Sequence, residues 1–281
     1  MKLSDSLPRS SLPRFGGPED CEQLWWGPDN LEEYRKHGGH PVYGEEDIIY
    51  RFNSFGYRCV DFTEAAQIRM VSIGCSWVFG VGLAQRDLFH ELFAQRLRRE
   101  LATTVVNWNL GRSGASNDYI ARVLHLAVPR LRPHVVLVLF TASNRREYIT
   151  ADNRLMNFNS LPPQNSHWVE RETWTHFNAL TNGYDDQLNL FRNYKSVETL
   201  LADYVWLFSA TNTNDLDLEP LAGHLDESHR AKKHRFVDKA RDHGHPGPET
   251  HKLLADLFWA KFLETGELAQ LRRSLSSAGT S

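Results

Sequence analysis

Four short, mainly apolar segments, separated by stretches with helical spacing, constrain the fold of this chain more than any other feature. The predicted strands span 68–73, 104–108, 133–140 and 204–208, and the predicted helices span 86–101, 119–131 and 184–202. Strands of continuous apolar residues that alternate with helices are typical of a parallel sheet that is buried on both faces. The sequence therefore predicts a doubly wound α/β core.

The region before this core has a different composition. Residues 1–45 are rich in Pro, Gly and charge, so only short regular elements are expected there. The alternating segment 47–52 predicts a strand that enters a turn. We expect residues 1–67 to form an arm and hairpin packed on the core.

The remaining chain, 68–275, is predicted to be one α/β domain with an insertion. Between 146 and 183 the periodicity is lost, which is typical of a lid or binding loop. A final helix is expected to open at Pro246, and the chain beyond Leu271 is expected to fray, with a flexible tail over 276–281.

Composition narrows the class of protein. A formal net charge of −3 gives no electrostatic reason to expect nucleic acid or an anionic membrane as partner. The 281 residues hold three cysteines without a paired pattern, so neither a disulfide framework nor a structural zinc site is indicated. No segment resembles a signal-peptide core or a membrane span. We expect a cytoplasmic protein with a small-molecule or peptide-like partner, and we predict no cofactor.

Polar and glycine-rich loops follow the predicted strands, where ligands bind in an open parallel sheet. These loops, together with the one before the last helix, span 74–80, 109–114, 141–144 and 242–248. Acyl transfer by a serine needs a hydroxyl, a base, a carboxylate that orients the base, and donors for the oxyanion. Ser76 can supply the hydroxyl, His245 the base and Asp242 the carboxylate. The N–H groups of Ser76 and Gly114 and the amide of Asn144 can supply the oxyanion donors.

These residues resemble the SGNH (GDSL-type) family of esterases and acyl hydrolases. The family blocks are Gly-Asp-Ser, Asn-x-x-x-x-Gly, Gly-x-Asn-Asp and Asp-x-x-His followed by Pro. The resemblance covers about 69–145 and 238–262, and the matching positions are Ser76, Gly114, Asn144, Asp242 and His245. It implies a flavodoxin-like three-layer α/β/α fold with a mainly parallel sheet, and metal-free chemistry on an ester.

Two positions depart from the family pattern. Cys75 replaces the aspartate beside the nucleophile, and the third block lacks its glycine and its final aspartate. Neither change removes a group that transfers a proton, but both make a lipid ester a poor guess for the substrate. The Gly-x-Ser-x-Gly elbow of α/β-hydrolases is not matched either, because Val78 occupies the last glycine position.

Simpler interpretations of several motifs stay open at this stage. Ser116 or Asn117 can cap a helix instead of forming the third block. Segment 242–245 can be read as half of a metal site, although no further ligand cluster accompanies it. Cys75 can be a small core residue and not a reactive thiol.

Substrate contacts are predicted at Trp77, Arg145, Trp168 and Trp174. The aromatic residues can bind an acyl group or pack the arm and lid on the core. Arg145 and its neighbour Arg146 can meet an anionic group, or they can begin a solvated helix.

The sequence thus predicts a serine-dependent hydrolase of an acyl or acetyl ester of a small molecule or carbohydrate. An acyltransferase or transesterase with the same site and an alcohol acceptor is one alternative. A ligand-binding module that keeps the fold without turnover is the other.

Overall fold

The computed structural model describes residues 18–63, 65–149, 155–158, 171–211, 219–231 and 235–278. At its centre lies a four-stranded parallel sheet in the order β4-β3-β5-β8. Its strands are β3 (Ile68–Gly74), β4 (Val105–Asn109), β5 (Val135–Phe140) and β8 (Val205–Ala210). Numbered along the chain, the core strands have the order 2-1-3-4, as in a flavodoxin-like sheet.

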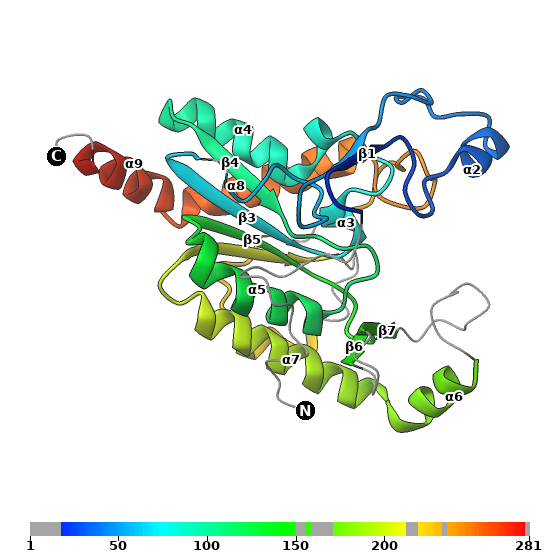
Figure 1. The fold of residues 1–281 in the computed structure, drawn as a ribbon. Coiled ribbons are helices and arrows are strands. Elements are labelled where there is room, and N and C mark those ends of the chain that lie inside the picture. Colours follow the sequence, from blue (N-terminus) through cyan, green and yellow to red (C-terminus); the bar gives the residue numbers. More distant parts are fainter. Residues whose placement is uncertain are drawn as a thin grey trace.

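Two layers of helices cover the sheet (Figure 1). The helices are α4 (Phe89–Leu101), α5 (Asn117–Leu131), α7 (Gly183–Leu200) and α8 (Pro248–Glu264). On one face α4 packs on α8, with the rings of Phe89 and Phe258 stacked at 5.3 Å, and α5 and α7 cover the other face (Figure 1). The predicted class, a mixed α/β fold with a parallel sheet flanked by helices, is confirmed.

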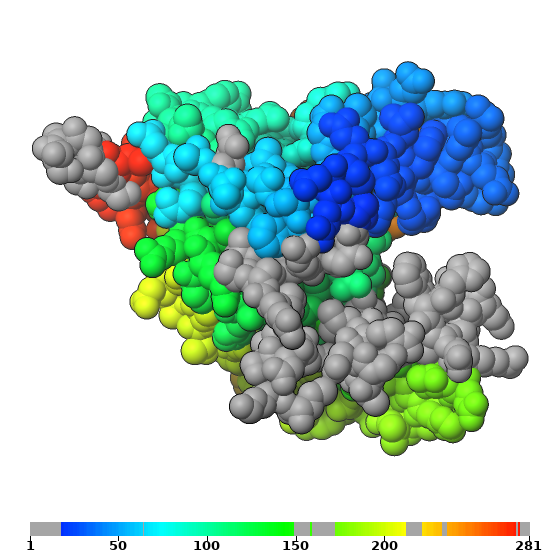
Figure 2. Space-filling model, in the orientation of Figure 1, coloured from blue at the N-terminus to red at the C-terminus, as the bar shows by residue number. Residues whose placement is uncertain are grey.

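The arm forms short elements, as predicted: β1 (Cys21–Gln23), α2 (Leu31–Lys36) and β2 (Tyr50–Phe52). Strand β2 pairs antiparallel with β1, which precedes it. The turn after β2 forms around Asn53, but the chain beyond it does not return as a strand. Instead, the fully buried Arg58 bonds to backbone carbonyl groups of the core. Figure 2 shows the described part of the arm, in blue, over one end of the molecule.

Regular elements occupy the described part of the predicted insertion. They are the antiparallel pair β6 (Arg146–Ile149) and β7 (Leu155–Phe158), and the helix α6 (Arg171–Leu180). The interpretation of Arg145 and Arg146 as a helix start is therefore wrong, because Arg146 opens a strand. Its buried guanidinium pairs with Asp185 at 2.7 Å and with Asp186 at 3.0 Å.

Two expectations at the C-terminal end are also corrected. Helix α8 opens at Pro248 and not at Pro246, because Pro246 pairs with Lys239 in an antiparallel bridge. The chain stays helical beyond Leu271 in α9 (Glu267–Ala278), because Leu271 is buried and Leu275 packs on the core under α4 and α8. Residues 279–281 lie outside the described residues. None of the described helices is long and apolar enough to cross a membrane.

Candidate active site

Ser76 lies at the carboxyl end of the central strand β3, at the first position of the short helix α3 (Ser76–Phe79). The turn is tight: a Cβ on Gly74 would lie 2.5 Å from Val78 Cγ2 and 2.7 Å from the carbonyl oxygen of Leu139. Only glycine therefore allows the strand to end here. The Ser76 N–H is among the first of a helix, which have no acceptor within the helix.

The environment of the Ser76 side chain is enclosed. Ser76 is 6% exposed, and its hydroxyl lies 3.9 Å from the sulfur of Cys75. Cys75 itself is 1% exposed and belongs to the apolar core, as its simpler interpretation predicted.

The second loop lies directly over the end of β3. The Arg112 N–H donates to the Gly74 carbonyl oxygen at 3.1 Å, and a Cβ on Gly111 would lie 2.5 Å from the Phe79 nitrogen. Gly114 occupies the third position of a turn that the Ala115 N–H closes on the Arg112 carbonyl oxygen. Its φ of +75° favours glycine, and apart from its chain neighbours no described residue has an atom within 4 Å of the position of a Cβ. This face of Gly114 is open.

The third loop carries Asn144, which is half-buried at the third position of a turn closed by the Arg145 N–H on the Ala142 carbonyl oxygen. The Arg145 side chain donates to the Ala115 carbonyl oxygen at 3.4 Å, so this loop contacts the second one. Asn117 ties the same two regions together. Its side-chain amide donates to the Thr141 carbonyl oxygen at 3.0 Å, and its side-chain oxygen accepts the Thr141 N–H at 2.9 Å.

The interpretation of segment 114–118 as a helix start is confirmed. The Ser116 hydroxyl accepts the Tyr119 N–H at 3.2 Å, which makes Ser116 the N-cap of α5. Asn117 is then the first helical residue, and its side chain is hydrogen-bonded to Thr141 in the third loop.

Asp242 and His245 form a hydrogen-bonded pair. The His245 Nδ1 lies 2.5 Å from Asp242 Oδ2, and Asp242 Oδ1 accepts the N–H groups of His245 and Gly244 at 3.0 and 3.2 Å. Burial of the Asp242 carboxyl acts to raise its pKa, but the hydrogen bond and charge of His245 and the two N–H groups outweigh burial. The pKa of Asp242 is therefore below its usual 3.8. With Nδ1 engaged, Nε2 is the His245 nitrogen that can take up a proton from a substrate or nucleophile.

The loop that carries this pair lies against the loop that follows α3. The N–H of Arg241 donates to the Gly82 carbonyl oxygen at 2.9 Å. Gly82 has a φ of +71°, and a Cβ there would lie 3.0 Å from the Asp242 nitrogen. The rings of Trp77 in α3 and of Phe236, upstream of Asp242, are 6.2 Å apart. Sequence-distant loops thus converge at the carboxyl edge of the sheet.

The described residues contain no hydrogen bond between the Ser76 hydroxyl and His245. In the absence of substrate such bonds are often long, and they tighten in the Michaelis complex. The structure places Ser76 and the Asp242–His245 pair on segments whose loops are hydrogen-bonded to each other through Gly82 and Arg241.

A second Asp-x-x-His pair occurs at Asp226 and His229, with His229 Nδ1 at 2.7 Å from Asp226 Oδ2. Sequence reasoning overlooked this pair. The carbonyl oxygen of His229 accepts the Phe208 N–H on the outer side of β8, and its ring stacks on Trp206. Strand β5 lies between β8 and β3, so this segment is three strand spacings from β3, or roughly 14 Å. It offers a natural control for His245.

The two histidines of segment 242–245, which the sequence allows as half of a metal site, contact different partners. His243 lies 3.0 Å from the Gly39 carbonyl oxygen and stacks on His37 at 4.3 Å, whereas His245 faces Asp242. In the part of the chain that the structure describes, no group of three or more metal-ligating side chains converges.

The predicted substrate contacts have different positions. Trp77 lies in α3 beside Ser76 and is half-buried, and Arg145 contacts the Gly114 loop. Trp174 is half-buried on α6, which Figure 1 shows at the same end of the molecule as α3. Trp168 lies outside the described residues. Their roles toward a substrate stay predictions.

No protein-family model matches the sequence, and no curated protein matches it. Solved structures do align with it. An α/β hydrolase from the metagenome of Lake Arreo, Spain, has 16% identity over 74% of this chain and 99% of its own, with a TM-score of 0.43. A lipase from a goat rumen metagenome has 11% identity over 69% and 97%, with a TM-score of 0.46.

A third aligned structure, from Desulfitobacterium hafniense, is described as a lipolytic protein of the G-D-S-L family. It has 14% identity over 69% of this chain and 99% of its own, with a TM-score of 0.34. These three aligned structures carry the names of a hydrolase, a lipase and a lipolytic protein, but their identities and TM-scores do not transfer an activity to this chain.

Proposed function

We propose that the protein is a serine-dependent ester hydrolase of the SGNH type, with Ser76 as nucleophile, His245 as base and Asp242 as the residue that orients the base. The observation that carries the proposal is the Asp242–His245 pair, at 2.5 Å, on a loop that is hydrogen-bonded to the loop following Ser76. A carboxylate that fixes one ring nitrogen leaves the other free to act on a hydroxyl.

The proposed reaction has two halves. His245 Nε2 takes the Ser76 hydroxyl proton as the Ser76 oxygen attacks the ester carbonyl carbon. The carbonyl oxygen becomes an oxyanion, for which the Ser76 N–H, the Gly114 N–H and the Asn144 amide are the proposed donors. His245 then gives the proton to the departing alcohol oxygen. In the second half, a water molecule activated by His245 cleaves the acyl-enzyme, and Ser76 recovers its proton.

The geometry of the loops supports these roles. Gly114 has an open face at a positive φ, and the Asn144 turn contacts the Gly114 loop through Arg145. The carboxyl ends of the parallel strands β4, β3 and β5 bring the three loops to one edge.

The test is hydrolysis of p-nitrophenyl esters of graded chain length by purified wild-type, Ser76→Ala, His245→Ala and His229→Ala proteins. We expect Ser76→Ala and His245→Ala each to lower kcat by about 10⁴-fold or more, because members of such a triad act as a unit. His229→Ala should stay within about two-fold of wild type, since His229 lies at the outer edge of β8. An unchanged rate for Ser76→Ala would refute the proposed function.

A further inference from the structure

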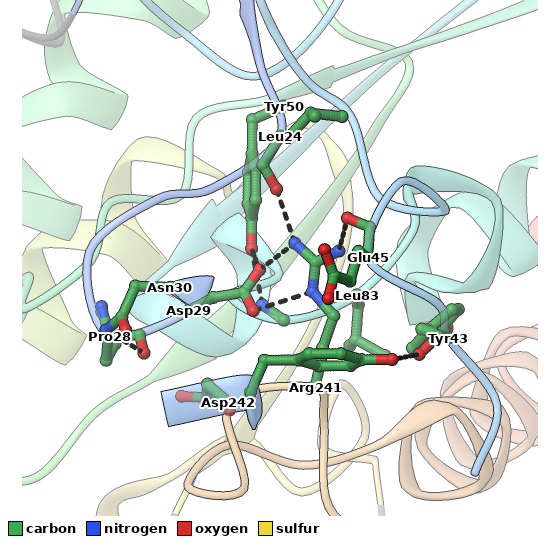
Figure 3. Close-up of polar contacts among 12 residues, drawn as sticks. Leu24, Pro28, Asp29, Asn30, Tyr43, Glu45, Tyr50, Leu83, Arg241 and Asp242 are labelled. Atoms are coloured by element: carbon green, nitrogen blue, oxygen red, sulfur yellow. Dashed lines mark hydrogen bonds and ion pairs between the residues drawn. The ribbon is translucent and has the colours of Figure 1, made fainter. Parts of the chain in front are cut away.

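A completely buried ion pair lies directly beside Asp242. Arg241 Nε and Nη2 donate to the two carboxylate oxygens of Asp29 at 2.9 and 2.8 Å, and both side chains are fully buried (Figure 3). Asp29 belongs to the arm, 212 positions upstream of Arg241. Its carboxylate therefore anchors the residue that precedes the proposed orienting acid.

The other donors of Arg241 also go to the arm. Nη1 donates to the Glu45 carbonyl oxygen at 2.9 Å, and Nη2 donates to that of Leu24 at 2.5 Å (Figure 3). The guanidinium carbon lies 3.8 Å from the centre of the Trp25 ring. The backbone N–H of Arg241 donates to the Gly82 carbonyl oxygen in the loop after α3. Arg241 thus contacts the arm through its side chain and this loop through its backbone.

Tyr50 connects this anchor to the nucleophile side of the site. Its hydroxyl donates to Asp29 Oδ2 at 2.6 Å and accepts the Gly82 N–H at 2.7 Å. Gly82 accepts the Arg241 N–H through its carbonyl group, so Asp29, Tyr50, Gly82 and Arg241 form a closed ring of hydrogen bonds. Neither loop can shift without breaking a bond of this ring.

Arg58, the second buried arginine of the arm region, bonds to the backbone that follows Ser76. Its guanidinium donates to the carbonyl oxygens of Phe79 at 3.1 Å, Gly80 at 2.5 Å and Leu83 at 2.6 Å. It lies 4.2 Å from the centre of the Tyr50 ring. Burial lowers the pKa of Arg58 to about 10, so the side chain keeps its charge at neutral pH.

Packing alone does not account for these contacts. Apolar side chains of similar volume would attach an arm to a core as well as a buried ion pair, or better, because charges lose their hydration on burial. The arm already has such packing: the rings of Trp26 and Phe52 are 4.8 Å apart, and Trp26 also contacts Phe79. Arg58 instead bonds to backbone groups that follow Ser76, and Asp29 bonds to the side chain of Arg241, the residue that precedes Asp242.

We propose that Asp29, Tyr50 and Arg58 are positioning residues, through which the arm holds the Ser76 loop and the Asp242–His245 loop in their reactive arrangement. This inference rests on the proposed function. It makes the arm a part of the active site and not an appendage, because Asp29, Tyr50 and Arg58 act on the position of the two loops and not on the substrate itself. Misplacement of a catalytic group by about 1 Å can cost about 100-fold in rate.

The test compares Asp29→Asn and Tyr50→Phe with wild type on p-nitrophenyl acetate, at a temperature where each protein is fully folded by circular dichroism. Asp29→Asn should lower kcat by about ten-fold or more with KM within about two-fold, because the loops move while the substrate contacts remain. Tyr50→Phe keeps the ring and removes one oxygen, and should lower kcat in the same direction by a smaller factor. The rate of covalent labelling by a fluorophosphonate should fall in parallel with kcat.

Two controls separate positioning from stability. Glu22→Gln removes an exposed ion pair of the same arm, and Phe262→Leu weakens the core near the C-terminal end of α8. Both should keep the wild-type kcat, even where Phe262→Leu unfolds at a lower temperature.

Each outcome is decisive. If Asp29→Asn does not fold, Tyr50→Phe decides alone. A wild-type kcat in the folded arm variants, or a loss no larger than in Phe262→Leu, overturns the inference and leaves the proposed function standing. A wild-type protein that neither turns over esters nor becomes labelled overturns the proposed function and this inference together.

Discussion

Substitution of Asp29 by Asn tests the buried ion pair as a source of stability. The change removes the charge of Asp29 and nearly preserves its shape, and it leaves the guanidinium of Arg241 buried without a counter-ion. Loss of one partner of a buried pair costs about 3–5 kcal/mol. Arg241 retains backbone carbonyl partners at Leu24, Gly44 and Glu45, which favours the lower end of this range.

We therefore expect Asp29→Asn to lower the free energy of unfolding by about 3 kcal/mol. For a chain of this size, that corresponds to a fall of about 6–12 °C in the unfolding midpoint. The assay is urea denaturation followed by tryptophan fluorescence, with calorimetry for the midpoint. Glu22→Gln, which breaks the exposed pair with Arg51, should change stability by less than about 1 kcal/mol.

A double-mutant cycle isolates the interaction. Asp29→Asn combined with Arg241→Met removes both charges, so the double variant should lose less stability than the sum of the single variants, by about 1–3 kcal/mol. The reasoning fails if Asp29→Asn is as stable as Glu22→Gln, or if the two single effects simply add.

Three further predictions concern the Asp242–His245 loop and the segments that contact it. Gly82→Ala should lower kcat by about ten-fold or more in ester assays, because a Cβ would contact the backbone of Arg241 and Asp242. The control is Gly266→Ala, which has a similar φ but no close contact, and it should leave kcat unchanged. The pKa of Asp242 is lowered on folding, so the Asp242 carboxylate contributes fully to stability above its unfolded pKa. This contribution is lost as the pH falls through the folded pKa. Urea denaturation at several pH values should therefore show that the difference in stability between wild type and Asp242→Asn becomes smaller at acid pH. Asp238→Ala removes the acceptor for two N–H groups that open α8 and should lower the free energy of unfolding by about 1–2 kcal/mol, measured by denaturation.

The core of the fold could be predicted from the sequence because its signals are local. Strand β5 is apolar at every position and all its residues are buried, so the continuous run 133–140 located it. The start of α8 was misplaced by two residues, since Pro246 and Pro248 carry the same local signal and only the bridge to Lys239 distinguishes them. The chain beyond Leu271 looked weakly apolar, and its helix depends on packing against the core.

The candidate site was predictable in part. The order of Ser76, Gly114, Asn144 and the Asp242–His245 pair followed a spacing that can be read along the chain. No spacing predicts that Arg241 pairs with Asp29, because the two residues are 212 positions apart and neither belongs to a motif. The same holds for Arg58, whose partners are backbone carbonyl groups that any sequence would supply.

The central claim is that Ser76 is a nucleophile activated by His245. Its most direct test is to treat the folded protein with a fluorophosphonate, digest it, and locate the adduct by peptide mass spectrometry. We predict one phosphonyl adduct, on the peptide that contains Ser76, in wild type and in His229→Ala. We predict no adduct in Ser76→Ala and a strongly slowed reaction in His245→Ala. An unlabelled wild-type protein, or an adduct on another residue that persists in Ser76→Ala, would contradict the assignment.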